Sequence, residues 1–201
     1  MNLMEIFTLI TGVIYIVLEI RQKNFMWVIG ILTSVAAMWV FFRQGLYASF
    51  GLNTYYLITA FIGLWQWRKY RDRLTDVQKE TSDDSIHLNP LPLKTAVVSL
   101  VVMVAGTAAL SWGMDALHGL GFLKENPMSL LDAHVAVLSA VATWWLVRSY
   151  LEQWWLWIVA DTMSTLLCAS QGMWWMTALY AAYTLSAVYG YIHWKRKGIY
   201  L

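Results

Sequence analysis

Residues 153–172 read QWWLWIVADTMSTLLCASQG, and this stretch is long and apolar enough to cross a bilayer as one helix. About 20 residues at a rise of 1.5 Å each match the hydrocarbon core of roughly 30 Å. A single carboxylate, Asp161, lies near the middle of the stretch. An ionised carboxylate at that depth costs at least ~2.5–3.5 kcal/mol, so we expect it to face protein rather than lipid. The sequence therefore predicts a membrane helix with a functional site at Asp161.

The expected helix places a semi-polar stripe on one face around this carboxylate. Residues recur there at the spacing i, i+4, i+7, i+8 and i+11, namely Trp157, Asp161, Ser164, Thr165 and Cys168. Aromatic faces beside an acid suit a flat organic solute that carries positive charge. The alternative is that Asp161 only hydrogen-bonds a neighbouring helix. Cys168 is the single cysteine, which excludes a disulfide framework, and we expect it to fill the core.

The composition indicates an integral membrane protein. Of the 201 residues, 59% are hydrophobic and 13% are charged, whereas soluble domains carry about 25% charged residues. A net charge of +2 is too small to argue for a nucleic-acid partner. No phosphate-binding loop, nucleophile elbow, zinc-protease motif or metal-ligand spacing is found, so we expect no enzyme activity, no cofactor and no metal.

Seven apolar runs predict seven transmembrane helices in an all-α protein. These runs are Leu3–Ile20, Phe25–Phe42, Leu46–Trp67, Thr95–Met114, Met128–Val147, Gln153–Ser170 and Trp174–Trp194. With the N-terminus outside, 12 of the 14 basic residues lie on the inner side. The positive-inside rule then predicts an outer N-terminus and a cytoplasmic C-terminus. Tryptophans near the run ends are expected to form an interfacial aromatic belt: Trp27, Trp65, Trp67, Trp174, Trp175 and Trp194.

An internal repeat divides the chain into two three-helix units. Adding 127 to a position in the first three runs gives a related residue in the last three, as with Gly63 and Gly190. Between positions 151 and 172 an offset of 130 fits better by residue type, which pairs Trp27 with Trp157 and Asp161 with Ile31. The expected parts are residues 1–67 as the first unit, 68–94 as a cytosolic linker, 95–114 as a connecting helix and 128–201 as the second unit.

One helix between two odd-numbered units gives both units the same orientation, a 3-1-3 parallel-repeat plan found in transporters. Such transporters bind their solute near the midplane, where Asp161 is expected. Asn53 and Tyr56 of the third run, with Tyr180 and Tyr183 of the seventh, offer polar and aromatic groups that can complete the site. The alternative for each of them is ordinary interhelical hydrogen bonding.

The runs DAHVAVLSAVATWWLVRSYLEQWWLWIVADTMSTLLCASQGMWW and RQGLYASFGLNTYYLITAFIGLWQWRK resemble the PnuC family of vitamin transporters, typified by nicotinamide riboside transporters. The resemblance covers essentially the whole chain. It implies a SWEET-like fold, a homotrimer, and facilitated diffusion across the bacterial inner membrane. It also implies a functional link to a cytosolic kinase that phosphorylates the vitamin and so traps it.

Two positions depart from the pattern of this family. Asn53 stands where riboside transporters commonly have Gln, and Asp161 stands where they commonly have Asn in a WxxxN motif that starts here at Trp157. The resemblance implies nicotinamide riboside as the solute, with thiamine as the alternative because an acid suits a permanent cation; a riboflavin branch also exists. The alternative of another class is a membrane receptor or assembly subunit that transports nothing.

Overall fold

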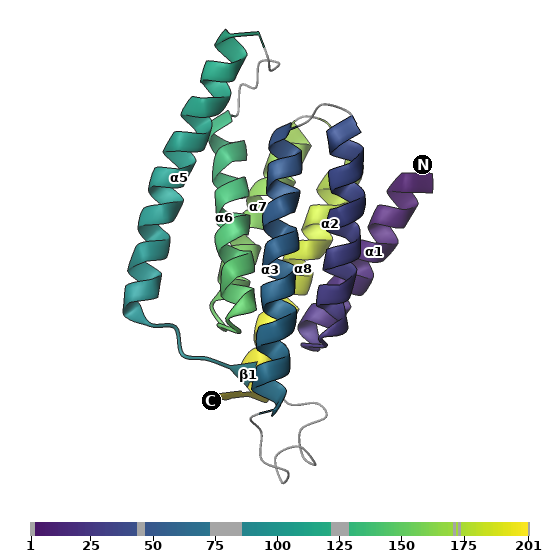
Figure 1. Ribbon diagram of the computed structural model, residues 1–201, viewed down its shortest axis with the longest axis vertical. Helices are drawn as coiled ribbons and strands as arrows, with labels where there is room; N and C mark the ends of the chain where they lie inside the picture. The colour runs from purple at the N-terminus through teal and green to yellow at the C-terminus, as the bar shows by residue number, and fades with distance from the viewer. Residues whose placement is uncertain are drawn as a thin grey trace. The chain divides into compact units, whose positions relative to one another are not determined.

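The computed structural model describes residues 3–43, 47–72, 86–121, 129–170, 172 and 174–200. This part of the chain is mostly helical, with seven helices and one pair of short strands (Figure 1). The elements in order are α1 (Leu3–Ile20), α2 (Phe25–Arg43), α3 (Tyr47–Asp72), β1 (Ile86–Leu88), α5 (Leu93–Gly119), α6 (Ser129–Val147), α7 (Gln153–Ser170), α8 (Trp174–Lys197) and β2 (Gly198–Tyr200). The helices begin and end within a few residues of the predicted apolar runs, except that α3 and α5 extend further.

The chain forms two compact units, and the first contains segments from three parts of the sequence. It comprises Met1–Asn89, Leu146–Ser149 and Ile192–Leu201. Helices α2 and α3 lie side by side in it (Figure 1). Strand β1 pairs in parallel with β2, in the register Ile86 with Gly198 and Leu88 with Tyr200. Because β1 and the end of α3 fall within residues 68–94, part of the expected linker is ordered secondary structure.

A hydrogen-bond cluster holds the turn after α1 against β1 and against the turn after α6. The Gln22 amide nitrogen donates to the His87 carbonyl oxygen at 2.9 Å and to Ser149 Oγ at 3.3 Å. The His87 backbone N–H donates to Gln22 Oε1 at 2.7 Å. Gln22 and Ser149 are 127 residues apart, and both adopt a left-handed backbone, with φ of 49° and 56°. Equivalent turns of the two repeats therefore have the same backbone conformation.

Three tryptophans of the expected belt lie instead in the interior of the first unit. Trp27, Trp67 and Trp194 are buried. The Trp27 and Trp67 ring centroids are 5.0 Å apart, and those of Trp67 and Trp194 are 6.4 Å apart. The Trp194 indole N–H donates to the Ile20 carbonyl oxygen at 3.0 Å. The belt prediction is wrong for these three rings, because position near a helix end does not decide which way an indole points.

The other three belt tryptophans are exposed, as the belt prediction requires. Trp65, Trp174 and Trp175 each expose more than half of their surface. An indole in this position suits the interface between lipid and water, because its ring is apolar and its N–H is polar.

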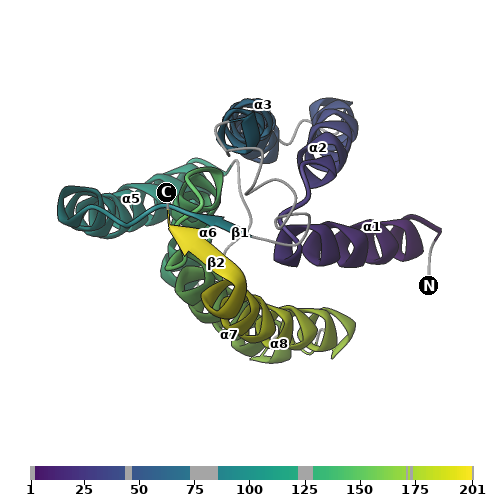
Figure 2. The same cartoon turned by 90° about the horizontal axis from the view of Figure 1, so that it is seen from below.

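The second unit comprises Pro90–Trp145 and Tyr150–Tyr191. Helix α5 packs against α6, where the Trp145 indole N–H donates to Ser99 Oγ at 3.0 Å and Thr107 Oγ1 lies 3.1 Å from His134 Nδ1. Helices α7 and α8 run side by side (Figure 2), and the rings of Trp155 and Tyr191 have centroids 5.1 Å apart. Lower-numbered residues of α7 therefore meet higher-numbered residues of α8, as in an antiparallel pair.

A pair of tryptophan–glycine contacts shows how the repeats align. A Cβ added at Gly63 would lie 2.5 Å from the Trp27 ring, and one added at Gly190 would lie 2.5 Å from the Trp154 ring. Trp27 is thus equivalent to Trp154, and the offset stays at 127 through α7. The local offset of 130, with its pairing of Trp27 and Trp157, is wrong. The tryptophan-rich start of α7 allowed two alignments by residue type, and only packing distinguishes them.

The correct alignment changes the counterpart of Asp161. At the offset of 127 it is Ser34 rather than Ile31, and both Asp161 and Ser34 are buried. The two repeats therefore place a polar side chain at the same buried position, but only the second repeat places an acid there. The pairing with Ile31 also implied that the two repeats differ chemically here, and they do, but the counterpart of Asp161 is Ser34.

The surface of α5 is strongly apolar. Judged by length and hydropathy alone, two of the described helices, α5 and α6, could cross a membrane. Six aliphatic side chains within two turns of α5 are exposed, namely Val97, Val98, Leu100, Val101, Val102 and Val104. Soluble monomers rarely expose a continuous apolar surface of this kind. The outer face of α5 is suited to contact lipid.

Candidate functional site

Helix α7 buries the face that carries the predicted stripe. Asp161, Ser164 and Cys168 are buried, while Trp157 and Thr165 are half-buried. The buried residues recur at helical spacing, because 3.6 residues per turn bring i, i+3 and i+7 to one side. The stripe is confirmed as an inward face, and the prediction that Cys168 is buried is also confirmed.

Two hydroxyls of the stripe are used by the helix itself. Ser164 Oγ donates to the Ala160 carbonyl oxygen at 2.8 Å, and Thr165 Oγ1 donates to the Asp161 carbonyl oxygen at 2.7 Å. Hydroxyls bonded back to the preceding turn offer a ligand only their lone pairs. Ser164 and Thr165 therefore have the weakest capacity to bind a solute among the predicted residues of α7.

The carboxylate of Asp161, unlike the hydroxyls of Ser164 and Thr165, is not hydrogen-bonded to the backbone of its own helix. Its residue is only 8% exposed. Thr165 Oγ1 donates to the backbone oxygen of Asp161 and not to its carboxylate. A carboxylate on a largely buried side chain is costly unless a donor or a cation lies beside it. This side chain has the capacity to bind a donor or a cation.

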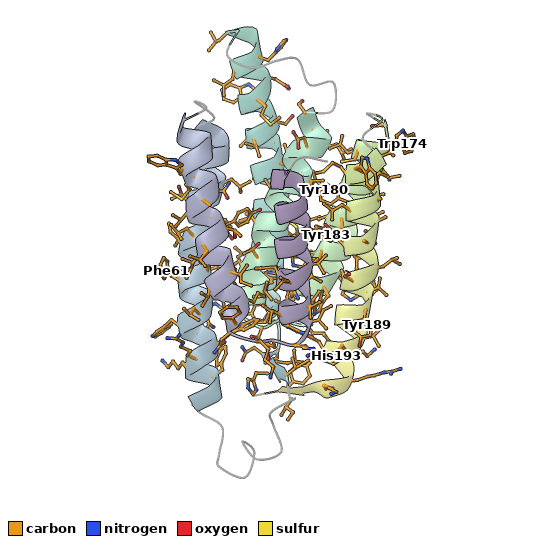
Figure 3. The ribbon with its side chains drawn as sticks, turned by 90° about the vertical axis from the view of Figure 1, so that its right-hand side faces the viewer. Phe61, Trp174, Tyr180, Tyr183, Tyr189 and His193 are labelled. Carbon is orange, nitrogen blue, oxygen red and sulfur yellow. The ribbon has the colours of Figure 1, made fainter. Side chains whose placement is uncertain are left out.

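Two tyrosines of α8 lie near this carboxylate. Tyr180 and Tyr183 both interact electrostatically with Asp161. Their ring centroids are 6.0 Å apart and their planes are perpendicular, and Figure 3 shows them about one turn apart on α8. Both rings are half-buried. Aromatic faces beside a carboxylate form the surroundings that a flat cation requires.

Trp157 adds an indole that lies one turn from Asp161 on the same face. Its Nε1 atom is buried and donates no hydrogen bond within the described part of the chain. A buried indole N–H normally has an acceptor. Trp157 therefore offers both a ring face and an unused donor.

The two predicted residues of α3 belong to the other compact unit. Asn53 and Tyr56 are half-buried, and each has an interaction with other residues. The ring centroids of Tyr55 and Tyr56 are 5.7 Å apart. The second unit thus brings together Asp161, Trp157 and the two tyrosines of α8, whereas Asn53 and Tyr56 are described only within the first unit.

Sequence reasoning missed one residue of the α7 face. Gln153 is completely buried, and the nitrogen and oxygen of its side-chain amide make no hydrogen bond in the described residues. It precedes Trp157 by four residues and Asp161 by eight, so the helical period places it on the same face. The signal was present in the sequence, but a glutamine at the start of an apolar run is usually an interfacial residue.

Comparison with known proteins identifies relatives along nearly the full chain. Residues 2–196 match the family model described as nicotinamide mononucleotide transporter. The nicotinamide riboside transporter PnuC of Neisseria mucosa is 26% identical over 198 residues, which covers 93% of this chain and 70% of the relative. The protein of the same name from Haemophilus influenzae is 24% identical over 188 residues, and the match covers 93% of this chain and 76% of the relative.

A solved structure shares the fold. The crystal structure of the vitamin B3 transporter PnuC superposes with a TM-score of 0.62 at 23% identity, and the match covers 94% of this chain and 79% of that one. The resemblance seen in the sequence is confirmed by the family model, which spans both repeats. This chain belongs to the nicotinamide mononucleotide transporter family.

Proposed function

We propose that the protein transports nicotinamide riboside into the cytosol by facilitated diffusion. The observation that carries this proposal is the buried Asp161 carboxylate, which has an indole one turn away on its own helix and two tyrosines of α8 within electrostatic range. The relatives named above are nicotinamide riboside transporters. Nicotinamide riboside has a flat, positively charged ring, which a carboxylate and aromatic faces complement.

Thiamine is the second candidate, and the chemistry of Asp161 is the specific observation that favours it. Riboside transporters commonly carry an amide at this position in the family pattern, whereas this chain carries an acid. Thiamine also has a permanent cation, and an acid attracts a cation more strongly than an amide does. The electrostatics of the site therefore suit both vitamins and disfavour uncharged riboflavin.

We further propose that the protein has seven transmembrane helices in a 3-1-3 parallel-repeat arrangement, with the N-terminus outside and the C-terminus in the cytoplasm. The matching bounds of α1 with α6, α2 with α7 and α3 with α8 support the repeat, and the basic residues support the orientation. We also propose that the protein is a homotrimer surrounded by the lipid of the bacterial inner membrane. A cytosolic kinase phosphorylates the vitamin that enters and so traps it.

Asn53 and Tyr56 stay in the proposal as candidate solute contacts supplied by α3. Asn53 provides both donors and an acceptor, which suit a carboxamide or a hydroxyl group. Tyr56 provides a ring with a polar tip. Substitution of Asn53 by Leu should lower solute affinity if the residue contacts the solute, and should leave it unchanged if its bonds are only interhelical.

The experiment uses the purified full-length protein in proteoliposomes. Internal and external concentrations of radiolabelled nicotinamide riboside should equilibrate faster than in protein-free vesicles. Excess unlabelled nicotinamide riboside should abolish the difference. If unlabelled thiamine competes better, thiamine is the solute. If a vitamin binds the protein but its flux equals that of empty vesicles, the chain is a receptor or assembly subunit and the transport proposal is wrong.

A further inference from the structure

Gln153 is a buried polar side chain for which packing offers no explanation. It is 0% exposed, and both polar atoms of its amide lack a hydrogen-bond partner in the described residues. An amide that is buried in this way gives up its bonds to water and receives nothing in exchange. Gln22 is also buried, but its amide is hydrogen-bonded to His87 and Ser149, as buried amides usually are.

The first repeat shows that the fold does not need an amide here. Met26 is the counterpart of Gln153 at the offset of 127, and it is also 0% exposed. Met and Gln have unbranched side chains of similar length, so a position that buries one accommodates the other. An apolar residue would fill this site without the cost of desolvation. Packing therefore does not explain why this position carries an amide.

Gln153 lies on the same face of α7 as the candidate solute site. Gln153, Trp157 and Asp161 follow one another at i, i+4 and i+8, so they lie on one face with a spacing of about 6 Å along the axis. The buried Trp157 indole N–H between them also lacks an acceptor in the described region. Trp157 and Gln153 therefore both carry unpaired polar atoms on the face of α7 that also carries Asp161.

We infer that Gln153 is a second solute-binding residue on α7, which recognises an uncharged group that both donates and accepts hydrogen bonds. A primary carboxamide and the hydroxyls of a sugar both have this chemistry. Asp161 contacts the cationic part of the solute, and Gln153, with the Trp157 N–H, contacts its neutral polar part. This inference rests on the proposed function, because it assigns a second contact of the same transport site.

The test compares Gln153→Met with Gln22→Met, which removes the same amide from a bonded environment. Thermal unfolding in detergent and calorimetric binding of nicotinamide riboside are measured on both variants and the wild type. For Gln153→Met we expect an unchanged or higher Tm with a loss of affinity of about tenfold, as for one hydrogen bond. For Gln22→Met we expect a lower Tm and an unchanged affinity in the folded protein. Wild-type affinity in Gln153→Met would overturn the inference.

Two solute analogues identify the group that Gln153 recognises. Both analogues must keep the positively charged ring that Asp161 is proposed to contact. 1-Methylnicotinamide keeps this ring and the carboxamide without the sugar, and the riboside of unsubstituted pyridine keeps the charged ring and the sugar without the carboxamide. If Gln153 pairs with the carboxamide, Gln153→Met weakens 1-methylnicotinamide and leaves the pyridine riboside unchanged; if it pairs with sugar hydroxyls, the pattern reverses. An effect on neither analogue contradicts the inference.

The outcome separates this inference from the proposed function. If the wild type binds nicotinamide riboside and Gln153→Met binds it equally well, only the role of Gln153 is wrong. If the wild type binds thiamine instead, the same two variants are compared with thiamine, which has a hydroxyl and an aminopyrimidine. If the wild type binds neither vitamin, the proposed function and the inference both fail.

Discussion

Asp161→Asn is the substitution that tests the proposed site most directly. It removes the negative charge and keeps almost the same shape, so packing is preserved and electrostatics change. The residue is 8% exposed, and the hydrogen bond from Thr165 goes to its backbone oxygen, so the variant keeps that bond. The unfolding temperature should therefore change little, and binding should report the role of the carboxylate.

The expected magnitude follows from the loss of one charge-assisted contact. A hydrogen bond to a charged group contributes about 1.5–3 kcal/mol, against about 0.5–1.5 kcal/mol for a neutral pair. The difference of roughly 1–2 kcal/mol corresponds to about fivefold to thirtyfold in affinity. Asp115→Asn is the matched control, because Asp115 belongs to the same unit but is exposed on α5, where water and salt screen its charge.

The assay is titration calorimetry with nicotinamide riboside, thiamine and riboflavin on the wild type and both variants. We expect one of the two cationic vitamins to bind the wild type and to weaken in Asp161→Asn, while Asp115→Asn stays within about twofold, since a screened surface charge contributes little. Riboflavin should bind poorly throughout. Unchanged affinities in a folded Asp161→Asn protein would refute the reasoning and make Asp161 a structural residue. An equal loss in Asp115→Asn would show a general charge effect.

Three further predictions concern packing, topology and energetics. Gly190→Ala should destabilise the protein by about 1–3 kcal/mol, because the new Cβ would lie 2.5 Å from the Trp154 ring, whereas Gly113→Ala meets no atom within 4 Å and should be neutral or slightly stabilising in thermal unfolding. In cells that carry a cysteine-free version, a cysteine at Ser82 should resist an impermeant thiol reagent and one at Lys124 should react; the reverse pattern would invert the topology. Because the sequence has no nucleotide-binding motif, ionophores that collapse proton and sodium gradients should leave the initial uptake rate in proteoliposomes unchanged, and accumulation above equilibrium without a kinase would contradict uncoupled transport.

The sequence by itself determined the helices, the repeat and the burial of the α7 face. Apolar runs predict helices because the backbone must satisfy its own hydrogen bonds in lipid, so length and hydropathy are sufficient. The acid in the middle of an apolar run predicted that α7 carries the functional site, because an unpaired carboxylate in lipid is costly. The helical period places Asp161 and Cys168 on one face, and the cost of an acid in lipid predicts that this face points inward.

Only the tertiary structure decided which residues share an environment. The side chain of Gln22 bonds β1 to the turn after α6, a contact between residues 65 and 127 positions apart that no local pattern encodes. Packing also gave the correct alignment of the repeats, because Trp154 and not Trp157 contacts the second-repeat glycine. The unpaired amide of Gln153 became visible in the same way. Hydrogen-bond partners and close contacts depend on distances between elements, and a sequence period specifies only the face on which a side chain lies.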